Sequence, residues 1–264
     1  MQNTSLLYKQ ILASEPHWFE TAVVVGETGD LITETGDKIL FGGTAILVAR
    51  AGAENGYQEE RLFSVRTSTQ MFTDDVTIGT AVSQEIEIKM LKPAGDLAGR
   101  MGAIVPYVRV CNETDKSEWL QQGVFFIDTR EISDNESDIV TVTIHGYDAM
   151  LKTEQYWQDT GHLNWGSGTV SDVDMVSEIA RIIDVTVDPR TWDIMTGNYR
   201  IPMPTNYTLR EVLCYIASMY LGGFIMTETG QLRLVSLLEL PAETNLLINE
   251  IGDYIVFGQD RIIV

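Results

Sequence analysis

The sequence predicts a strand-dominated α+β fold, and three observations lead to that prediction. Short stretches rich in β-branched and aromatic residues recur through the first 146 residues, with turn residues between them. Two of these stretches alternate apolar and polar side chains, which is typical of a strand with one buried face. Two amphipathic helices follow in the second half. We expect an antiparallel β-barrel or sandwich, an inserted or following α/β lobe, and a second, partial β unit.

The first part of the chain is predicted to hold a short helix followed by strands. Residues 5–13 have apolar side chains at roughly helical spacing, with Asn3, Thr4 or Ser5 as the N-cap. The duplicated tetrapeptide ETGD, at residues 27–30 and 34–37, supplies two Gly-Asp turns. The strand candidates lie at residues 19–25, 39–50, 62–67, 86–90, 103–111, 123–128 and 140–144.

Alternation gives the clearest strand signal. Ile86, Ile88 and Met90 alternate with charged residues, and the segment 140–145 repeats this period of two. One set of side chains therefore packs on a core while the other meets water. Closure of such strands into a barrel would also remove the exposed sheet edges that invite uncontrolled pairing.

The character of the sequence changes after Gly146, where helices are predicted. Residues 147–155 are expected to form a short helix with Asp148 near its start, because exposed N–H groups favour a carboxylate there. A longer helix follows, with apolar residues three and four apart and Ser171 or Asp172 as its cap.

The second long helix has better-defined ends. Thr208 and Glu211 form a capping box at its start, and the pair Gly222–Gly223 is expected to end it. A hairpin with its turn at Thr229–Gly230 should follow. The hairpin strands are placed at residues 223–228 and 231–238, and further strands at 254–258 and 261–264.

These signals divide the chain into three predicted parts. Residues 1–146 form a β-barrel-like domain, and residues 147–240 form an α/β lobe with two main helices. Residues 241–264 contribute strands that complete or begin a second β unit. A chain of 264 residues with 44% hydrophobic content is long enough to bury the cores of two such units.

The charge of the chain argues against two classes of partner. It has 18 basic and 38 acidic side chains, a formal net charge of −20, which repels nucleic acid and anionic lipid. We expect no nucleic-acid partner; the acidic surface serves solubility or faces a complementary partner in an assembly. No apolar run approaches the ~20 residues that cross a bilayer, and the N-terminus lacks a signal-like segment. We therefore expect synthesis in the cytoplasm and no membrane insertion.

The two cysteines lie far apart, each in a mainly apolar stretch. Cys111 and Cys214 are expected to be buried free thiols, and a disulfide between them is the less favoured alternative.

Catalytic chemistry has few candidates in this sequence. His17, His145 and His162 have no zinc-ligand spacing around them, and no G-x-S-x-G elbow is present. Residues 166–168 (GSG) precede a helix but lack the lysine and preceding strand of a phosphate loop, so a plain loop is expected. Paired carboxylates can serve hydrolysis when they flank a cleft, but in a chain this acidic we expect solvated faces and helix starts. The pairs are Glu85 with Glu87, Glu131 with Asp134, and Asp172 with Asp174.

Two further clusters have a weak functional interpretation. The turn SDNESD, with Asp134, Glu136 and Asp138, could attract calcium, although it lacks the glycine and distal glutamate of an EF-hand loop. Tryptophans in the mid-chain loops could stack on sugar, but packing in a core or interface is favoured. These tryptophans are Trp157, Trp165 and Trp192. We name no catalytic, cofactor-binding or metal-binding residue, and we expect no cofactor and no enzyme activity.

Five segments, in this order and spacing, resemble the hub or baseplate hub proteins of phage tails and phage-derived contractile particles. The segments are Ile78–Met90 (IGTAVSQEIEIKM), Ser117–Arg130 (SEWLQQGVFFIDTR), Val140–Gln155 (VTVTIHGYDAMLKTEQ), Thr208–Ala217 (TLREVLCYIA) and Gly230–Leu234 (GQLRL). Each one alone is strand, turn and cap chemistry. Their ordered combination over residues 78–237 carries the resemblance.

The resemblance implies a structural virion component. It would form a homotrimeric ring that joins the tail tube, or a distal tail ring protein, to the tip or spike, with the domain at residues 1–146 docking on the tube. The alternative is a tail-tip module that binds or hydrolyses the host cell wall. In either case the protein would reside in the virion tail or baseplate after assembly.

Overall fold

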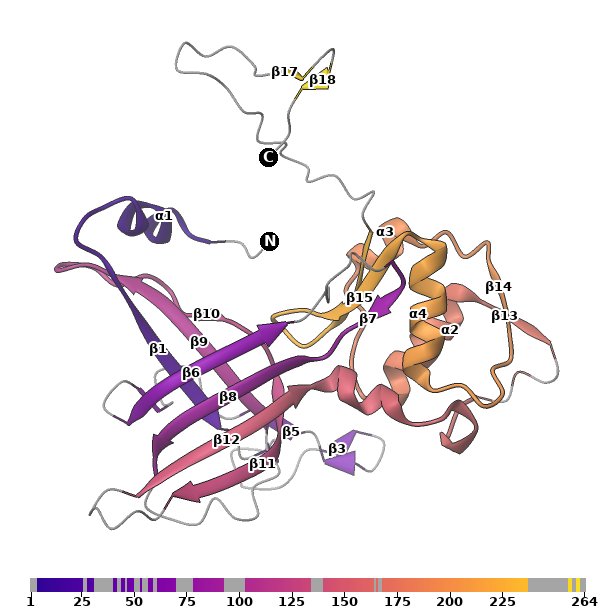
Figure 1. The fold of residues 1–264 in the computed structure, drawn as a ribbon, viewed down its shortest axis with the longest axis horizontal. Helices are drawn as coiled ribbons and strands as arrows, with labels where there is room; N and C mark the ends of the chain where they lie inside the picture. Colours follow the sequence, from indigo (N-terminus) through magenta and orange to yellow (C-terminus); the bar gives the residue numbers. More distant parts are fainter. Residues whose placement is uncertain are drawn as a thin grey trace.

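A strand-rich body with a helical lobe at one end makes up the computed structural model (Figure 1). The structure describes residues 4–25, 28–30, 40–41, 44–45, 47–49, 53, 57–58, 61–69, 78–92, 103–133, 140–163, 165, 168–236, 256–257 and 260–261.

Among the described residues up to 148, the named elements are one α-helix and twelve strands. They are α1 (Leu6–Leu12), β1 (Trp18–Val25), β2 (Thr28–Asp30), β3 (Leu40–Phe41), β4 (Thr44–Ala45), β5 (Leu47–Ala49), β6 (Leu62–Thr69), β7 (Thr80–Ala81), β8 (Gln84–Leu91), β9 (Ala103–Cys111), β10 (Leu120–Gln121), β11 (Phe125–Ser133) and β12 (Thr141–Asp148).

Helices are concentrated in the following segment. It contains the 3₁₀ helices η2 (Ala149–Glu154) and η3 (Trp157–Asp159), then β13 (Thr169–Ser171), α2 (Asp172–Ile182), α3 (Arg190–Ile194), β14 (Arg200–Pro202), α4 (Leu209–Met219), β15 (Gly222–Met226) and β16 (Leu232–Ser236). The short strands β17 (Val256–Phe257) and β18 (Asp260–Arg261) come last.

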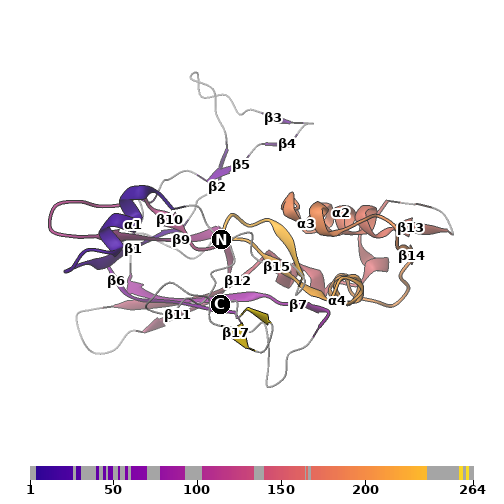
Figure 2. The same ribbon diagram turned by 90° about the horizontal axis from the view of Figure 1, so that it is seen from above.

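Within the described ranges, the main sheet has seven strands, all antiparallel to their neighbours, in the order β1-β9-β11-β12-β8-β6, with β10 added on β9. Figure 2 shows β1 and β9 in one layer and β6 and β11 in a second layer below it in the view, so the sheet folds over itself as in a sandwich. Among the described residues no ladder joins β1 to β6, so no closed barrel is seen. The predicted class, strand-dominated α+β with a sandwich-like layout, is confirmed.

The predicted alternation decides which side chains fill this sheet's core. Ile86, Ile88 and Met90 on β8 are at most 2% exposed, while the residues between them face outward. The same core includes Val23 of β1 and Ile104 of β9, together with Phe125, Val142 and Ile144. Each large side chain buried this way contributes about 1.5–3 kcal/mol to folding.

The predicted N-terminal helix is present, and its cap ties it to the sheet. Ser5 Oγ accepts a hydrogen bond from the Tyr8 N–H at 3.0 Å. The Ser5 N–H and Oγ donate to the two carboxylate oxygens of Glu118 at 2.7 and 2.6 Å. Ile11 is the buried residue of the helix, which packs beside β9. Ser5, not Asn3 or Thr4, is therefore the cap.

The helical lobe has a small sheet of its own, in the order β16-β15-β7. Strand β15 pairs with β16 as the predicted hairpin, and with β7 in parallel at Gly223–Thr80. The core beside it contains Trp157 and buried apolar residues of α2 and α4. Strand β7 thus comes from the first half of the chain but completes a sheet in the second.

Both long helices begin as predicted, whereas the end of α4 differs. Ser171 caps α2, and the Thr208–Glu211 capping box is complete. However, α4 ends at Met219, and Leu221 takes a positive φ of 50°. The expected stop at Gly222–Gly223 is wrong because both glycines belong to β15, where a Cβ at Gly222 would lie 2.3 Å from the Val235 carbonyl oxygen.

Some expectations on local structure need correction. The short helix expected at residues 147–155 is a 3₁₀ helix that starts later, because β12 continues to Asp148. Helix α3 and the pair β13–β14 were not predicted, since their five and three residues carry too little periodicity. Residues 134–139, 31–39 and 241–255 lie outside the described part, so the calcium turn and the second ETGD turn are not tested.

The three-part division at residues 146 and 240 stays a prediction.

Within the parts of the chain that the structure describes, no helix has the length and apolar character to cross a membrane.

Candidate functional site at the junction of sheet and lobe

The five segments that carry the sequence resemblance meet where the main sheet joins the helical lobe. Gly79, just before β7, lies so close to α4 that a Cβ there would be 2.9 Å from the Cys214 carbonyl oxygen. On the other side, Gly230 approaches Val124, with a Cβ-to-side-chain distance of 3.1 Å. Segments that are distant in sequence therefore form one packed junction.

Asp148 forms the polar centre of this junction. Its carboxylate accepts hydrogen bonds from Ser83 Oγ at 2.9 Å, the Gln84 N–H at 2.9 Å and the Met150 N–H at 3.0 Å. The side chain therefore caps η2 and also holds the start of β8. Burial raises the pKa of Asp148, while the three hydrogen bonds favour its ionised form. This buried carboxylate therefore links the residues at the start of β8 to the start of η2.

Arg210 links α4 to the same corner. Its guanidinium forms an ion pair with Glu154 at 2.9 Å. It also lies within 3.4 Å of the Met150 carbonyl oxygen and 3.5 Å of Thr153 Oγ1. The side chain is 27% exposed, so it ties the end of η2 to α4 at the rim of the junction.

Two glutamine side chains bridge sheet and lobe directly. Gln84 Nε2 donates to the Met226 carbonyl oxygen at 3.3 Å, and Gln121 Nε2 donates to the Glu228 carbonyl oxygen at 2.8 Å. Nearby, the Lys152 ammonium lies 4.4 Å from the centre of the Phe126 ring. The lobe is therefore attached at several points besides the chain connections.

A hollow of about 310 Å³ opens beside Asp148. Ser83, Glu85, Tyr147 and Arg210 contribute to its lining. The Glu85 and Arg210 side chains give it both charges, but the guanidinium already pairs with Glu154. The arrangement can position segments of chain, and we assign no reaction to it.

A second charged cluster joins the edge strand β1 to its neighbour. Glu20 bonds to Arg109 at 2.6 Å and to Lys116 at 2.7 Å, and its own side chain is 16% exposed. Burial alone would raise the pKa of Glu20, but hydrogen bonds and ion pairs with Lys116 and Arg109 lower it to about 2. Arg109 also lies 4.1 Å from the centre of the Trp119 ring. The cluster therefore ties β1 to β9 and to Lys116.

Both cysteines are free, as predicted. Cys111 is buried, and Cys214 is half-buried. Burial raises the pKa of each thiol. Neither sulfur is therefore activated as a nucleophile.

Two of the three carboxylate pairs considered from the sequence lie within the described residues, and neither pair faces across a cleft. Glu85 and Glu87 both lie on β8, where Glu87 is paired with Arg66 of β6 and His145 of β12. Asp172 is fully buried and accepts a hydrogen bond from Tyr220, whereas Asp174 is exposed beside the Ser171 cap. Glu131 is exposed on β11, and Asp134 lies outside the described residues.

The histidines and tryptophans lie in local contacts. His17 Nδ1 is 2.7 Å from the Ser14 carbonyl oxygen, and His162 stacks on Trp157 at 4.8 Å between centroids. Trp157 is 1% exposed and also stacks on Trp165, so packing is the use confirmed for this pair. No group of three or more His, Cys, Asp or Glu residues that could hold a metal occurs among the described residues.

Large apolar side chains remain exposed at the N-terminal helix and the start of β1. Leu6 is 72% exposed, and four neighbours in sequence are between 41% and 48% exposed. We call this group the N-terminal patch; its members are Leu6, Leu7, Leu12, Trp18 and Phe19. Three of these side chains lie on α1 and two on β1, where the consecutive residues Trp18 and Phe19 point to opposite faces of the strand.

Sequence reasoning missed the residues that hold the junction together. Ser83 and Arg210 lie inside the segments of resemblance, but neither stands out by type or spacing. Asp148 was singled out only as a helix-start carboxylate. Its contact with Ser83 spans 65 residues of sequence and has no local signal.

Comparisons with known proteins give distant similarities. No protein-family model matches the chain, and no curated protein matches it. Among solved structures, the 43 kDa tail protein of prophage MuSo2 from Shewanella oneidensis has 13% identity and a TM-score of 0.49, over 87% of this chain and 59% of that chain. The tail protein from Neisseria meningitidis MC58 has 12% identity and a TM-score of 0.42, over 82% of this chain and 50% of that chain. The chain thus spans less than two thirds of either protein, and with TM-scores below 0.5 neither similarity defines its fold or function.

Proposed function

We propose that this chain is a structural hub protein of a phage tail, whose copies form a homotrimeric ring between the tail tube and the tip or spike. The proposal rests on the sequence resemblance of residues 78–237. One structural observation carries it further: the five segments of that resemblance converge on a single junction. The contacts between these segments support treating them as one structural unit.

The junction supports a role in assembly because it fixes two surfaces relative to each other. Asp148, Arg210, Gln84 and Gln121 hold the sheet and the lobe at one angle. A ring component has to present its contacts at defined angles, since closure of a symmetric ring depends on them. The sheet would face one neighbour and the lobe another.

The surface also suits a protein that binds other proteins. The N-terminal patch offers apolar side chains that a partner can cover. The net charge of −20 would orient a complementary partner, which we propose is the tail tube or distal tail ring protein on one side and the spike or tip protein on the other. We propose neither nucleic-acid binding nor catalysis, and the assembled protein would belong to the virion tail or baseplate.

The absolute mass of the purified chain tests the ring. Light scattering on a sizing column, over a wide concentration range, should give three times the 29.5 kDa of one chain. A strict monomer at every concentration would contradict self-assembly. Binding or cleavage of purified cell-wall glycan by that monomer would replace the proposal with a cell-wall-acting tail-tip module.

A further inference from the structure

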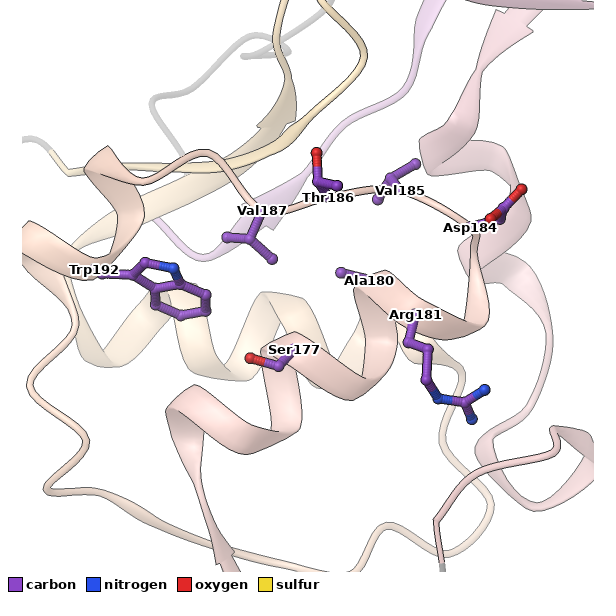
Figure 3. Close-up of a pocket in the computed structure, with 8 residues that line it drawn as sticks. All are labelled: Ser177, Ala180, Arg181, Asp184, Val185, Thr186, Val187 and Trp192. Carbon is purple, nitrogen blue, oxygen red and sulfur yellow. The ribbon is translucent and has the colours of Figure 1, made fainter. Parts of the chain in front are cut away.

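An open groove lies on the lobe, away from the junction. It has a volume of about 520 Å³ and runs between α2 and the segment 184–187, which begins with the turn residue Asp184. Figure 3 shows Val187, Trp192 and Ala180 around one open space, with Asp184 at the far end. Its apolar lining comes from Ala180, Val185, Val187 and the Trp192 ring, which is 36% exposed.

Within this segment Val187 forms one isolated parallel bridge and keeps unused backbone groups. The Leu232 N–H donates to the Thr186 carbonyl oxygen, and the Asp188 N–H donates to the Leu232 carbonyl oxygen, both at 2.9 Å. Val187 is thereby paired in parallel with Leu232, so its own N–H and C=O point away from β16. Neither group bonds to another residue within the described ranges. Such an edge is a template for a further strand.

The charges at one end of the groove are uneven. The Arg181 guanidinium is neutralised by Glu178 at 2.8 Å and also donates to the Gly161 carbonyl oxygen at 2.7 Å. Asp184 is exposed, and its carboxylate makes no ion pair or hydrogen bond with another described residue. It also follows the C-terminus of α2, where the helix dipole is negative. A positive side chain is the complement of that end.

We propose that this groove binds an extended segment of a partner protein, which adds a strand beside residues 185–187. The unpaired groups of Val187 require an extended backbone, and the lining beside Trp192 requires an apolar side chain. Asp184 requires a lysine or arginine near one end of the segment. The net charge of −20 favours a different protein over a second copy of this chain. The inference does not depend on the proposed hub function.

The test uses the full chain, isotope-labelled for NMR, and the probe peptide acetyl-Lys-Val-Thr-Val-Lys-amide. Its sequence reads the same in both directions, so either strand orientation can bind. We expect saturable shifts of the Val185 and Val187 amide signals and of the Trp192 indole signal. The same peptide with the nitrogens of both valines and of the threonine methylated should bind about fivefold or more weakly, because its three central residues then have no backbone N–H to donate. A peptide with glutamate in place of lysine should also bind more weakly.

Substitutions on the protein separate the groove from general charge effects. Asp184→Asn suits the positive φ of 60° at this position and should weaken binding of the lysine peptide about two- to fivefold. Asp159→Asn, which removes an exposed charge elsewhere, should leave binding unchanged. Equal binding of the methylated peptide, or no binding of any peptide, would overturn the proposal. So would slow hydrogen exchange of the Val187 amide in the free chain, because the edge would then already be paired.

Discussion

Asp148 and Ser83 are joined by a hydrogen bond of 2.9 Å that connects the end of β12 to the start of β8 across 65 residues of sequence. Because the Asp148 carboxylate also accepts from two backbone N–H groups, one side chain satisfies three donors in a buried place. This relationship makes the junction of sheet and lobe a single unit. Removal of either side chain should therefore destabilise both the main sheet and the helical lobe.

Asp148→Asn is expected to lower the free energy of unfolding by about 1–3 kcal/mol at pH 7. The amide supplies one acceptor oxygen and one NH₂ group, so at least one buried N–H or O–H loses its partner. Urea denaturation, with Asp159→Asn as the exposed control, measures the difference. Equal stability of the two variants would show that Asp148 does not hold the junction.

The pH dependence of this variant follows from the raised pKa of Asp148. The folded chain binds the proton more tightly than the unfolded chain, so this group adds stability below the ordinary value of 3.8 and loses it as pH rises through the folded pKa. The penalty of Asp148→Asn should therefore be larger at pH 4 than at pH 7. A penalty that shrinks on acidification would contradict the assigned direction.

Glu20→Gln should behave in the opposite way. The pKa of Glu20 is lowered from 4.5 to about 2, so its contribution is present above pH 4.5 and is lost as pH falls toward 2. With allowance for solvent screening, we expect a loss of about 2 kcal/mol at pH 7. Denaturation curves of both proteins from pH 7 down to pH 2 should converge. Parallel curves would mean that the ion pairs with Arg109 and Lys116 contribute little.

Gly79→Ala tests the contact between β7 and α4. The new Cβ would lie 1.8 Å from Ser218 Oγ and 2.9 Å from the Cys214 carbonyl oxygen, and φ at Gly79 is +82°. Crowding and backbone strain together should cost about 2–4 kcal/mol. Gly168→Ala is the matched control, since a Cβ there meets nothing within 4 Å. Thermal unfolding of the two variants should differ clearly, and similar midpoints would count against the contact.

Leu6→Lys tests the N-terminal patch as a contact between copies in the proposed ring. Leu6 is 72% exposed in the single chain, so a charge there should leave the circular dichroism spectrum unchanged. If the patch lies between copies, burial of the new charge should convert the trimer to monomer in light scattering. Leu163→Lys, at 53% exposure on the lobe, should leave the mass unchanged. The reverse pattern would move the contact to the lobe.

Sequence patterns predicted helices and strands well where residues close in sequence determine the local structure. Ile88 and Ile144 are buried because strand alternation puts them on the apolar face of the sheet. Thr208 and Glu211 form a capping box within one helical turn. By contrast, Gly222 was interpreted as a helix stop. A glycine is needed there because a Cβ would collide with the Val235 carbonyl oxygen. The partner of Gly222 comes from the next strand, which spacing along the chain does not reveal.

The candidate site was harder to predict for the same reason. Asp148, Ser83 and Arg210 come from three separate segments, and their contacts depend on how the sheet meets the lobe. The segments could be recognised by resemblance, but the roles of individual residues could not. The groove beside Trp192 has no sequence signal, because its edge arises from the single bridge between Val187 and Leu232.

The parallel pairing of Thr80 with Gly223 has a consequence for the order in which the protein is made. During synthesis β7 leaves the ribosome long before β15, so its pairing edge must wait while most of the chain is translated. A gene fragment that starts at residue 149, directly after β12, would encode α2, α4 and the hairpin without β7, which pairs with β15. Splitting the chain there should therefore yield two pieces that become soluble only when co-expressed.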